Sequence, residues 1–151
     1  MDRAVTESLQ GFESDAQWLK TRPGEQCRLI RVSSENTQRR YALVEIVSKP
    51  GDGTTLHVHE KEDEHMLVLE GTARIANGDN RFNAQAGELV SLRRGIPHAW
   101  GNRSNSDLRI VMLISPGGCE EILRLIPKTP LAELPALAGW FHIRALGPTP
   151  F

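Results

Sequence analysis

The chain has 151 residues, enough for one domain with a hydrophobic core and too few for two domains of ordinary size. Its 18 basic and 19 acidic residues nearly balance, so the charge favours neither a nucleic acid nor a membrane surface as partner. The N-terminus lacks the apolar stretch of a signal peptide and no segment approaches the roughly 20 apolar residues of a membrane helix, so we expect a soluble, cytoplasmic protein.

The first 26 residues are polar and mixed, with Trp18 and Leu19 as the expected anchors of an N-terminal extension. From Cys27 onward, short segments rich in β-branched and aromatic residues alternate with turns rich in Gly, Asn and Asp. The expected strands are residues 27–32, 41–47, 54–59, 65–70, 72–77, 80–84, 88–93, 97–101 and 108–115. Short strands at this spacing predict an all-β fold, an antiparallel sandwich or barrel.

The hydrophobic period changes after the Pro-Gly-Gly sequence at residues 116–118. Ile122, Leu125 and Ile126 lie at i, i+3 and i+4, which predicts a short amphipathic helix that ends at Pro127. The tail from Trp140 onward is expected to pack back on the sheets. We therefore divide the chain into an extension (1–26), a β domain (27–115) and a C-terminal helix with its tail (116–151).

Two histidines one residue apart, His57 and His59, are the most informative feature of the chain. Side chains alternate along a strand, so these two imidazoles share one face about 7 Å apart and can point toward one centre. Glu64 and His98 would add one carboxylate oxygen and a third imidazole nitrogen. Such a set suits Fe, Mn, Ni, Cu or Zn, and it has no thiolate that would select a soft ion.

Glycines frame these residues at regular distances. The first spaced set is Gly51, His57, His59, Glu64 and Gly71, and the second is Gly87, Gly95, His98 and Asn102. They resemble the two motifs of the cupin superfamily, G-x5-H-x-H-x3-4-E-x6-G and G-x5-P-x-G-x2-H-x3-N. Arg93 stands where the family usually has proline. This departure concerns the geometry of a turn and leaves the ligand positions intact.

The resemblance implies a small antiparallel jelly-roll barrel whose closure brings His98 beside His57 and His59. It also implies one divalent transition metal, bound by these three residues and Glu64. The spacing selects Glu64 from an acidic segment in which Glu60, Glu62 and Asp63 are expected to form a solvated rim. The C-terminal sequence resembles that of small cupins of the quercetin-dioxygenase-like kind.

Strand alternation extends the ligand argument to a pocket. If Glu64 faces inward, Met66 and Val68 should do so, and Ile96 and Trp100 should accompany His98. Met66 and Trp100 are the expected substrate-binding residues because they lie nearest the ligands. A second inward row is expected from Leu108, Ile110, Met112 and Ile114. The predicted pocket is therefore apolar and aromatic around one metal.

Three functions remain open for such a site. We favour a metal-dependent dioxygenase of a small aromatic or enolisable substrate, with Glu64 as general base toward an enol proton. A non-redox enzyme (isomerase, lyase or decarboxylase) is the alternative, and a sugar-phosphate substrate would then require an inward basic residue such as Arg74. The third possibility is a sensing or binding module without turnover, because one barrel hosts many chemistries.

The remaining expectations concern cysteines and assembly. Cys27 and Cys119 show no C-x-x-C spacing and are expected to be free thiols. Small cupins commonly pair, and the apolar residues of the C-terminal helix predict a homodimer. Alternatively, that helix only caps its own barrel.

Overall fold

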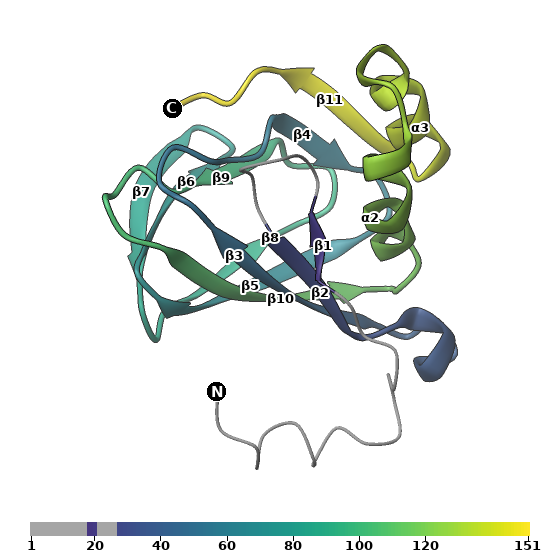
Figure 1. The fold of residues 1–151 in the computed structure, drawn as a ribbon, viewed down its shortest axis with the longest axis horizontal. Helices are drawn as coiled ribbons and strands as arrows, with labels where there is room; N and C mark the ends of the chain where they lie inside the picture. The colour runs from purple at the N-terminus through teal and green to yellow at the C-terminus, as the bar shows by residue number, and fades with distance from the viewer. Residues whose placement is uncertain (1–17, 21–26) are drawn as a thin grey trace.

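The computed structural model describes residues 18–20 and 27–151, and within them two antiparallel sheets face each other (Figure 1). The first sheet has the order β1 (Leu19–Lys20), β2 (Cys27–Val32), β3 (Ala42–Ser48), β10 (Leu108–Ser115), β5 (Asp63–Glu70) and β8 (Leu89–Leu92). The second has the order β11 (Ile143–Gly147), β4 (Leu56–His59), β9 (His98–Gly101), β6 (Thr72–Asn77) and β7 (Asn80–Gln85). This jelly-roll barrel confirms the all-β prediction.

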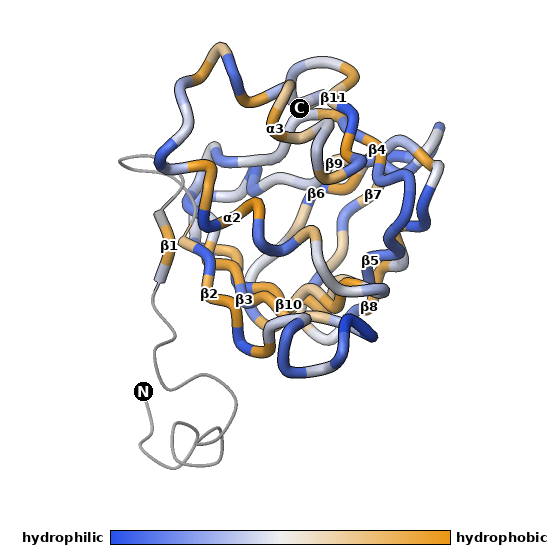
Figure 2. The backbone as a smooth tube through the Cα atoms, turned by 90° about the vertical axis from the view of Figure 1, so that its right-hand side faces the viewer, coloured by the Kyte–Doolittle hydropathy of each residue, from blue (hydrophilic) through white to orange (hydrophobic). Residues whose placement is uncertain are grey.

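The core lies between the two sheets and follows the expected alternation. The β10 row of Leu108, Ile110, Met112 and Ile114 is buried, as are Met66 and Val68 of β5. Orange, apolar segments gather along β2, β3 and β10 in Figure 2, interrupted by single charged residues, while the loops between strands are mostly hydrophilic. Burial of these alternating residues stabilises the barrel by removing apolar surface from water.

Tight turns set the strand ends where the sequence places glycines. Gly71, between β5 and β6, has φ +81°, and a Cβ atom there would lie 2.5 Å from the carbonyl oxygen of Asp107. Both facts require glycine at this position. Gly78, at the turn between the antiparallel partners β6 and β7, also has a positive φ, +57°.

The expectation for Ile96 was wrong. Its side chain is 40% exposed, whereas Trp100 is 3% exposed. Ile96 lies in a turn in which its backbone N–H donates to the carbonyl oxygen of Arg93, and β9 begins only at His98. Strand alternation therefore does not extend back to Ile96.

The C-terminal segment covers one end of the barrel (Figures 1 and 2). It consists of the 3-10 turn Cys119–Glu121, α2 (Ile122–Leu125), the 3-10 turns Ile126–Lys128 and Leu131–Glu133, and α3 (Leu134–Trp140). The helical path continues past Pro127, which occupies the start of a 3-10 turn, where its missing N–H costs little. The tail then pairs with β4 as β11, so it packs on the barrel as predicted.

Of the predicted N-terminal extension, the structure describes only residues 18–20. Leu19 and Lys20 pair with Arg28 and Cys27, and Leu19 packs against the core as its predicted anchoring role requires. The remaining residues of that prediction, 1–17 and 21–26, lie outside the described residues. In the part of the chain that is described, no helix has the length and apolar character needed to cross a membrane.

Candidate metal centre

Three strands bring the four expected ligands together. His57 of β4 is the direct antiparallel partner of His98 of β9, and Glu64 reaches the same centre from β5 in the opposite sheet. Ligand atoms of His57, His59, Glu64 and His98 all lie within 4.8 Å of one another. Glu64 Oε2 lies 3.0 Å from His98 Nε2, and Glu64 Oε1 lies 3.5 Å from His59 Nε2. The cluster is able to hold a metal ion.

The opposite nitrogen of each imidazole is held by a hydrogen-bond acceptor. His57 Nδ1 lies 2.7 Å from the carbonyl oxygen of Thr55, and His98 Nδ1 lies 3.1 Å from that of Ile96. A carbonyl oxygen can only accept, so both Nδ1 atoms must donate. In neutral rings the Nε2 lone pairs then face the centre, as metal ligation requires.

The contact between His98 and Glu64 tests whether the donor set fits a cation. When Nδ1 of a neutral His98 donates its proton to the carbonyl oxygen of Ile96, Nε2 carries a lone pair. That lone pair faces Glu64 Oε2 at 3.0 Å. Two acceptors at that distance repel each other unless a proton or a metal ion lies between them. Three nitrogen donors and one carboxylate oxygen suit a divalent transition metal, so the residues present fit such an ion.

The charges of the cluster also suit a cation. Burial acts to raise the pKa of Glu64, but His59 and His98 beside it hold that pKa at about 2. Burial and the neighbouring His98 lower the pKa of His57 to about 4. For His59, burial opposes protonation, and the Glu64 and Glu62 carboxylates nevertheless raise the pKa above its ordinary value. At neutral pH the centre therefore combines an ionised carboxylate with a neutral His57.

Glu62 does not belong to a solvated rim, and that expectation was wrong. Its side chain is buried beneath the site, and Glu62 Oε2 accepts from His59 Nδ1 at 3.3 Å. Because the turn after β4 folds back, the third residue after His59 meets the far side of the same ring. Glu62 thus fixes the orientation of one expected ligand.

Cys119 contacts the same nitrogen from the C-terminal segment. Its sulfur lies 3.9 Å from His59 Nδ1, and both cysteines that the structure describes are free, as predicted. Burial and the nearby Glu62 carboxylate raise the pKa of the Cys119 thiol. Cys119 therefore remains protonated and packs against His59 as a small, weakly polar group.

The turn that contains Arg93 is held to two neighbouring strands by hydrogen bonds. Gly95 N–H donates to the carbonyl oxygen of His59 at 2.8 Å, which ties this turn to the end of β4. Arg94 binds Asp63 through its backbone N–H and its guanidinium group, and the guanidinium holds the pKa of that carboxyl at about 2. Asp63 thus joins the turn to the start of β5, next to the expected ligand Glu64.

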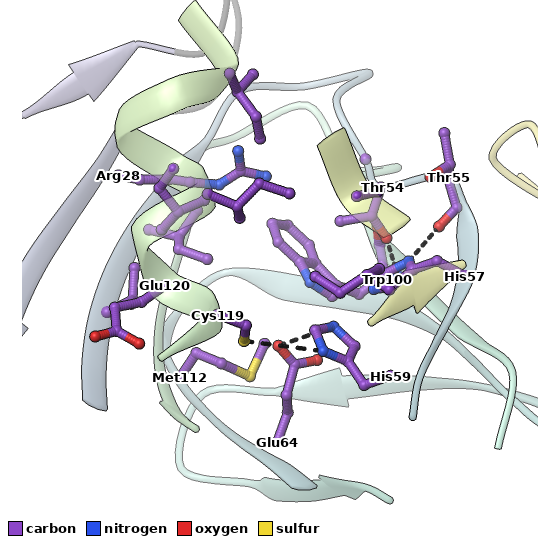
Figure 3. Close-up of a pocket in the computed structure, with 18 of the residues that line it drawn as sticks. Arg28, Thr54, Thr55, His57, His59, Glu64, Trp100, Met112, Cys119 and Glu120 are labelled. Atoms are coloured by element: carbon purple, nitrogen blue, oxygen red, sulfur yellow. Dashed lines mark hydrogen bonds and ion pairs between the residues drawn. The ribbon is translucent and has the colours of Figure 1, made fainter. Parts of the chain in front are cut away.

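A cavity of about 480 Å³ extends from the ligands toward the C-terminal segment (Figure 3). His57, His59, Glu64 and Trp100 line it, together with Met112 and aliphatic residues of β3, β10 and α2. Met66 is fully buried and does not line this cavity. Met112, its direct partner on the neighbouring strand, lines the cavity instead.

Sequence reasoning missed the arginine of this wall. Arg28 lines the cavity, whereas the predicted Arg74 bonds Asn83 on the exposed side of β6 and does not line it. Alternation was the available signal, because Arg28 precedes the buried Ile30 by two residues on β2. For Cys119 no local signal exists, since 60 residues separate it from His59.

Comparison with known proteins identifies the barrel. Residues 44–114 match the model of the cupin domain. The barrel of this chain belongs to the cupin superfamily. A solved structure of similar fold is KdgF from Halomonas sp., with a TM-score of 0.62 and 19% identity over 70% of this chain and 90% of that one.

Two curated relatives are much longer than the matched region. Mannose-1-phosphate guanylyltransferase 2 of Escherichia coli O157:H7 is 31% identical over 87 residues, which cover 56% of this chain and 18% of that protein. Quercetin 2,3-dioxygenase of Bacillus subtilis is 24% identical over 103 residues, covering 68% of this chain and 30% of the relative. The cupin barrel is thus similar to only a part of each relative.

Proposed function

We propose that this cupin is a metal-dependent dioxygenase of a small aromatic or enolisable substrate. The observation that carries the proposal is the position of the donor cluster on a largely apolar cavity that Trp100 also lines. The similarity to quercetin 2,3-dioxygenase supports the same chemistry. A volume of about 480 Å³ lies within the usual range of small-molecule sites.

His57, His59, Glu64 and His98 are the proposed ligands of one divalent metal. When bound, the metal would supply a Lewis-acid and redox centre for the reaction of the substrate with O₂. Glu64 is ionised at neutral pH because its pKa is about 2, so it can accept the proton of a substrate enol or phenol. Trp100 offers an aromatic face to hold a planar ring, and the aliphatic wall excludes water.

The test begins with elemental analysis of protein purified without added metal. O₂ uptake by the Fe, Mn, Ni and Cu forms is then measured against flavonols, catechols and β-diketones. Glu64→Gln keeps a neutral oxygen donor but removes the base, so turnover should fall more than substrate binding. Absence of O₂ uptake across the whole panel, with tight ligand binding intact, would replace the dioxygenase by a binding module.

A non-redox metal enzyme acting on an anionic substrate is the second candidate. Arg28 supplies the inward basic residue that such a substrate requires. The similarity to a mannose-1-phosphate guanylyltransferase gives this candidate independent support. Turnover of a sugar phosphate by the zinc form, without O₂ consumption, would favour it over the dioxygenase.

A further inference from the structure

Arg28 places a positive charge on the cavity wall, away from the metal ligands. It lies on β2, where it pairs with Ile46 of β3, another residue of the same wall. In Figure 3 its guanidinium group points into the pocket, and in this view Trp100 lies between it and the pair Glu64 and His59. The cavity therefore has a cation at one end and a metal-ligating cluster at the other.

The other residues that line the cavity leave the positive charge of Arg28 in mainly apolar surroundings. Among the described lining residues, Arg28 is the one lysine or arginine, and those that β3, β10 and α2 contribute are aliphatic apart from Met112. The carboxylates of this wall already have partners. Glu120 accepts from the backbone N–H groups of Ser34 and Gly118, and Asp52 accepts from that of Lys49.

A guanidinium group carries five N–H donors and can serve two acceptors at once, so it can bind a substrate while it keeps a protein contact. Its planar fork matches the two oxygens of a carboxylate or phosphate. A cation in a largely apolar wall attracts an anion more strongly than one in water does, because the local dielectric is low.

We propose that Arg28 binds an anionic group, carboxylate or phosphate, at the end of the substrate opposite to the oxygens that face the metal site. The substrate is then an acid whose body lies against Trp100 and the aliphatic wall. This inference rests on the proposed metal-dependent function for the position of the other end. Among aromatic or enolisable ligands, it predicts that an acid binds more tightly than its neutral analogue.

Calorimetry on the zinc-loaded protein tests the proposal without oxidative turnover, because Zn²⁺ has no redox chemistry. The first probe pair is 3-(3,4-dihydroxyphenyl)propanoate and its methyl ester, which differ in charge and little in shape. The second pair is mannose 1-phosphate and mannose. We expect one acid to bind at least about tenfold more tightly than its neutral counterpart, as a charge-assisted hydrogen bond requires.

The preference for the acid should disappear in Arg28→Gln and persist in part in Arg28→Lys, which keeps the charge. Arg74→Gln is the matched control, since this arginine does not line the cavity, and it should leave the preference unchanged. Melting temperatures of all variants report the folded state. A purely structural Arg28 would change the melting temperature and leave the acid-to-neutral ratio as it was.

The pair that shows the preference identifies the substrate class as an aromatic acid or a sugar phosphate. Equal affinities within both pairs, or an undiminished preference in Arg28→Gln, overturn the proposal. Failure of the proposed dioxygenase is a separate result. In that case no metal form consumes O₂, while the charge preference measured on the zinc form stands.

Discussion

Glu62 offers the sharpest test of how this metal centre is organised. Its carboxylate accepts from His59 Nδ1 at 3.3 Å inside the protein, where the side chain is 6% exposed. Glu62→Ala removes this acceptor and leaves the buried N–H without a strong partner, since its other contact among the described residues is the weak acceptor Cys119 Sγ at 3.9 Å. The ring of His59 is then free to rotate or to change tautomer.

Loss of such an outer partner typically lowers metal affinity 10–100-fold, which is about 1.4–2.7 kcal/mol. Glu62→Gln should fall between the wild type and Glu62→Ala, because an amide oxygen still accepts but carries no charge. Competition titration with a chromophoric chelator measures the affinity for Zn²⁺ or Co²⁺. The Co²⁺ spectrum reports any change of geometry at the ion.

Glu60→Ala is the matched control from the same acidic segment. Its side chain is half-exposed and lies 3.5 Å from Arg144, away from the ligands, so metal affinity should not change. Equal affinities of Glu62→Ala and Glu60→Ala would refute the reasoning. The melting temperature of the metal-free variants separates loss of folding from loss of ligation.

The other predictions concern ligation, pH, the pocket and assembly. The double variant His57→Ala/His98→Ala should lose most bound metal by elemental analysis, and full occupancy would refute the ligand assignment. The metal-free protein should lose stability on acidification, measured by denaturant unfolding at several pH values. Folded His57 resists protonation until about pH 4, and folded Glu64 until about pH 2, whereas the unfolded groups take up protons near their ordinary pKa values of 6.5 and 4.5. A free energy of unfolding that stays constant between pH 6.5 and 3 would contradict this expected loss of stability. Trp100→Ala should weaken binding of a planar ligand by a stacking contribution of roughly 0.5–1.5 kcal/mol while metal stays bound, whereas Met66→Ala should cost about 2–5 kcal/mol of unfolding free energy and spare the ligand. Light scattering should give twice the chain mass of 16.8 kDa, and a monomer at micromolar concentration would rule out the homodimer.

The structure points to a different surface for the expected dimer contact than the C-terminal helix. Ile122 and Ile126 of the C-terminal segment line the cavity, so the helix caps its own barrel, as the alternative anticipated. On the outer face of the first sheet, Leu67 and Leu89 are direct partners on β5 and β8 and are 37% and 64% exposed. Leu89→Glu therefore tests the dimer more directly than a change in the helix.

Local sequence determined the strands, the turns and the paired ligands of this protein. Alternation with period two is a property of the extended backbone, so it places His57 and His59 on one face whatever the rest of the chain does. Gly71 marks a positive φ for an equally local reason. Motif spacing then selected Glu64 and His98 as partners, and both lie in the cluster that can hold a metal ion.

Only the tertiary structure decided what surrounds those ligands. Strand pairing sets His98 opposite His57, and the return of the C-terminal segment brings Cys119 to His59 across 60 residues. Neither contact has a local pattern, because each depends on barrel closure and on the path of a covering segment. The turn after β4 likewise buries the Glu62 side chain against His59, whereas its charge alone predicted that this side chain would be exposed. Side-chain direction follows from the sequence where the backbone is regular, and from packing where it is not.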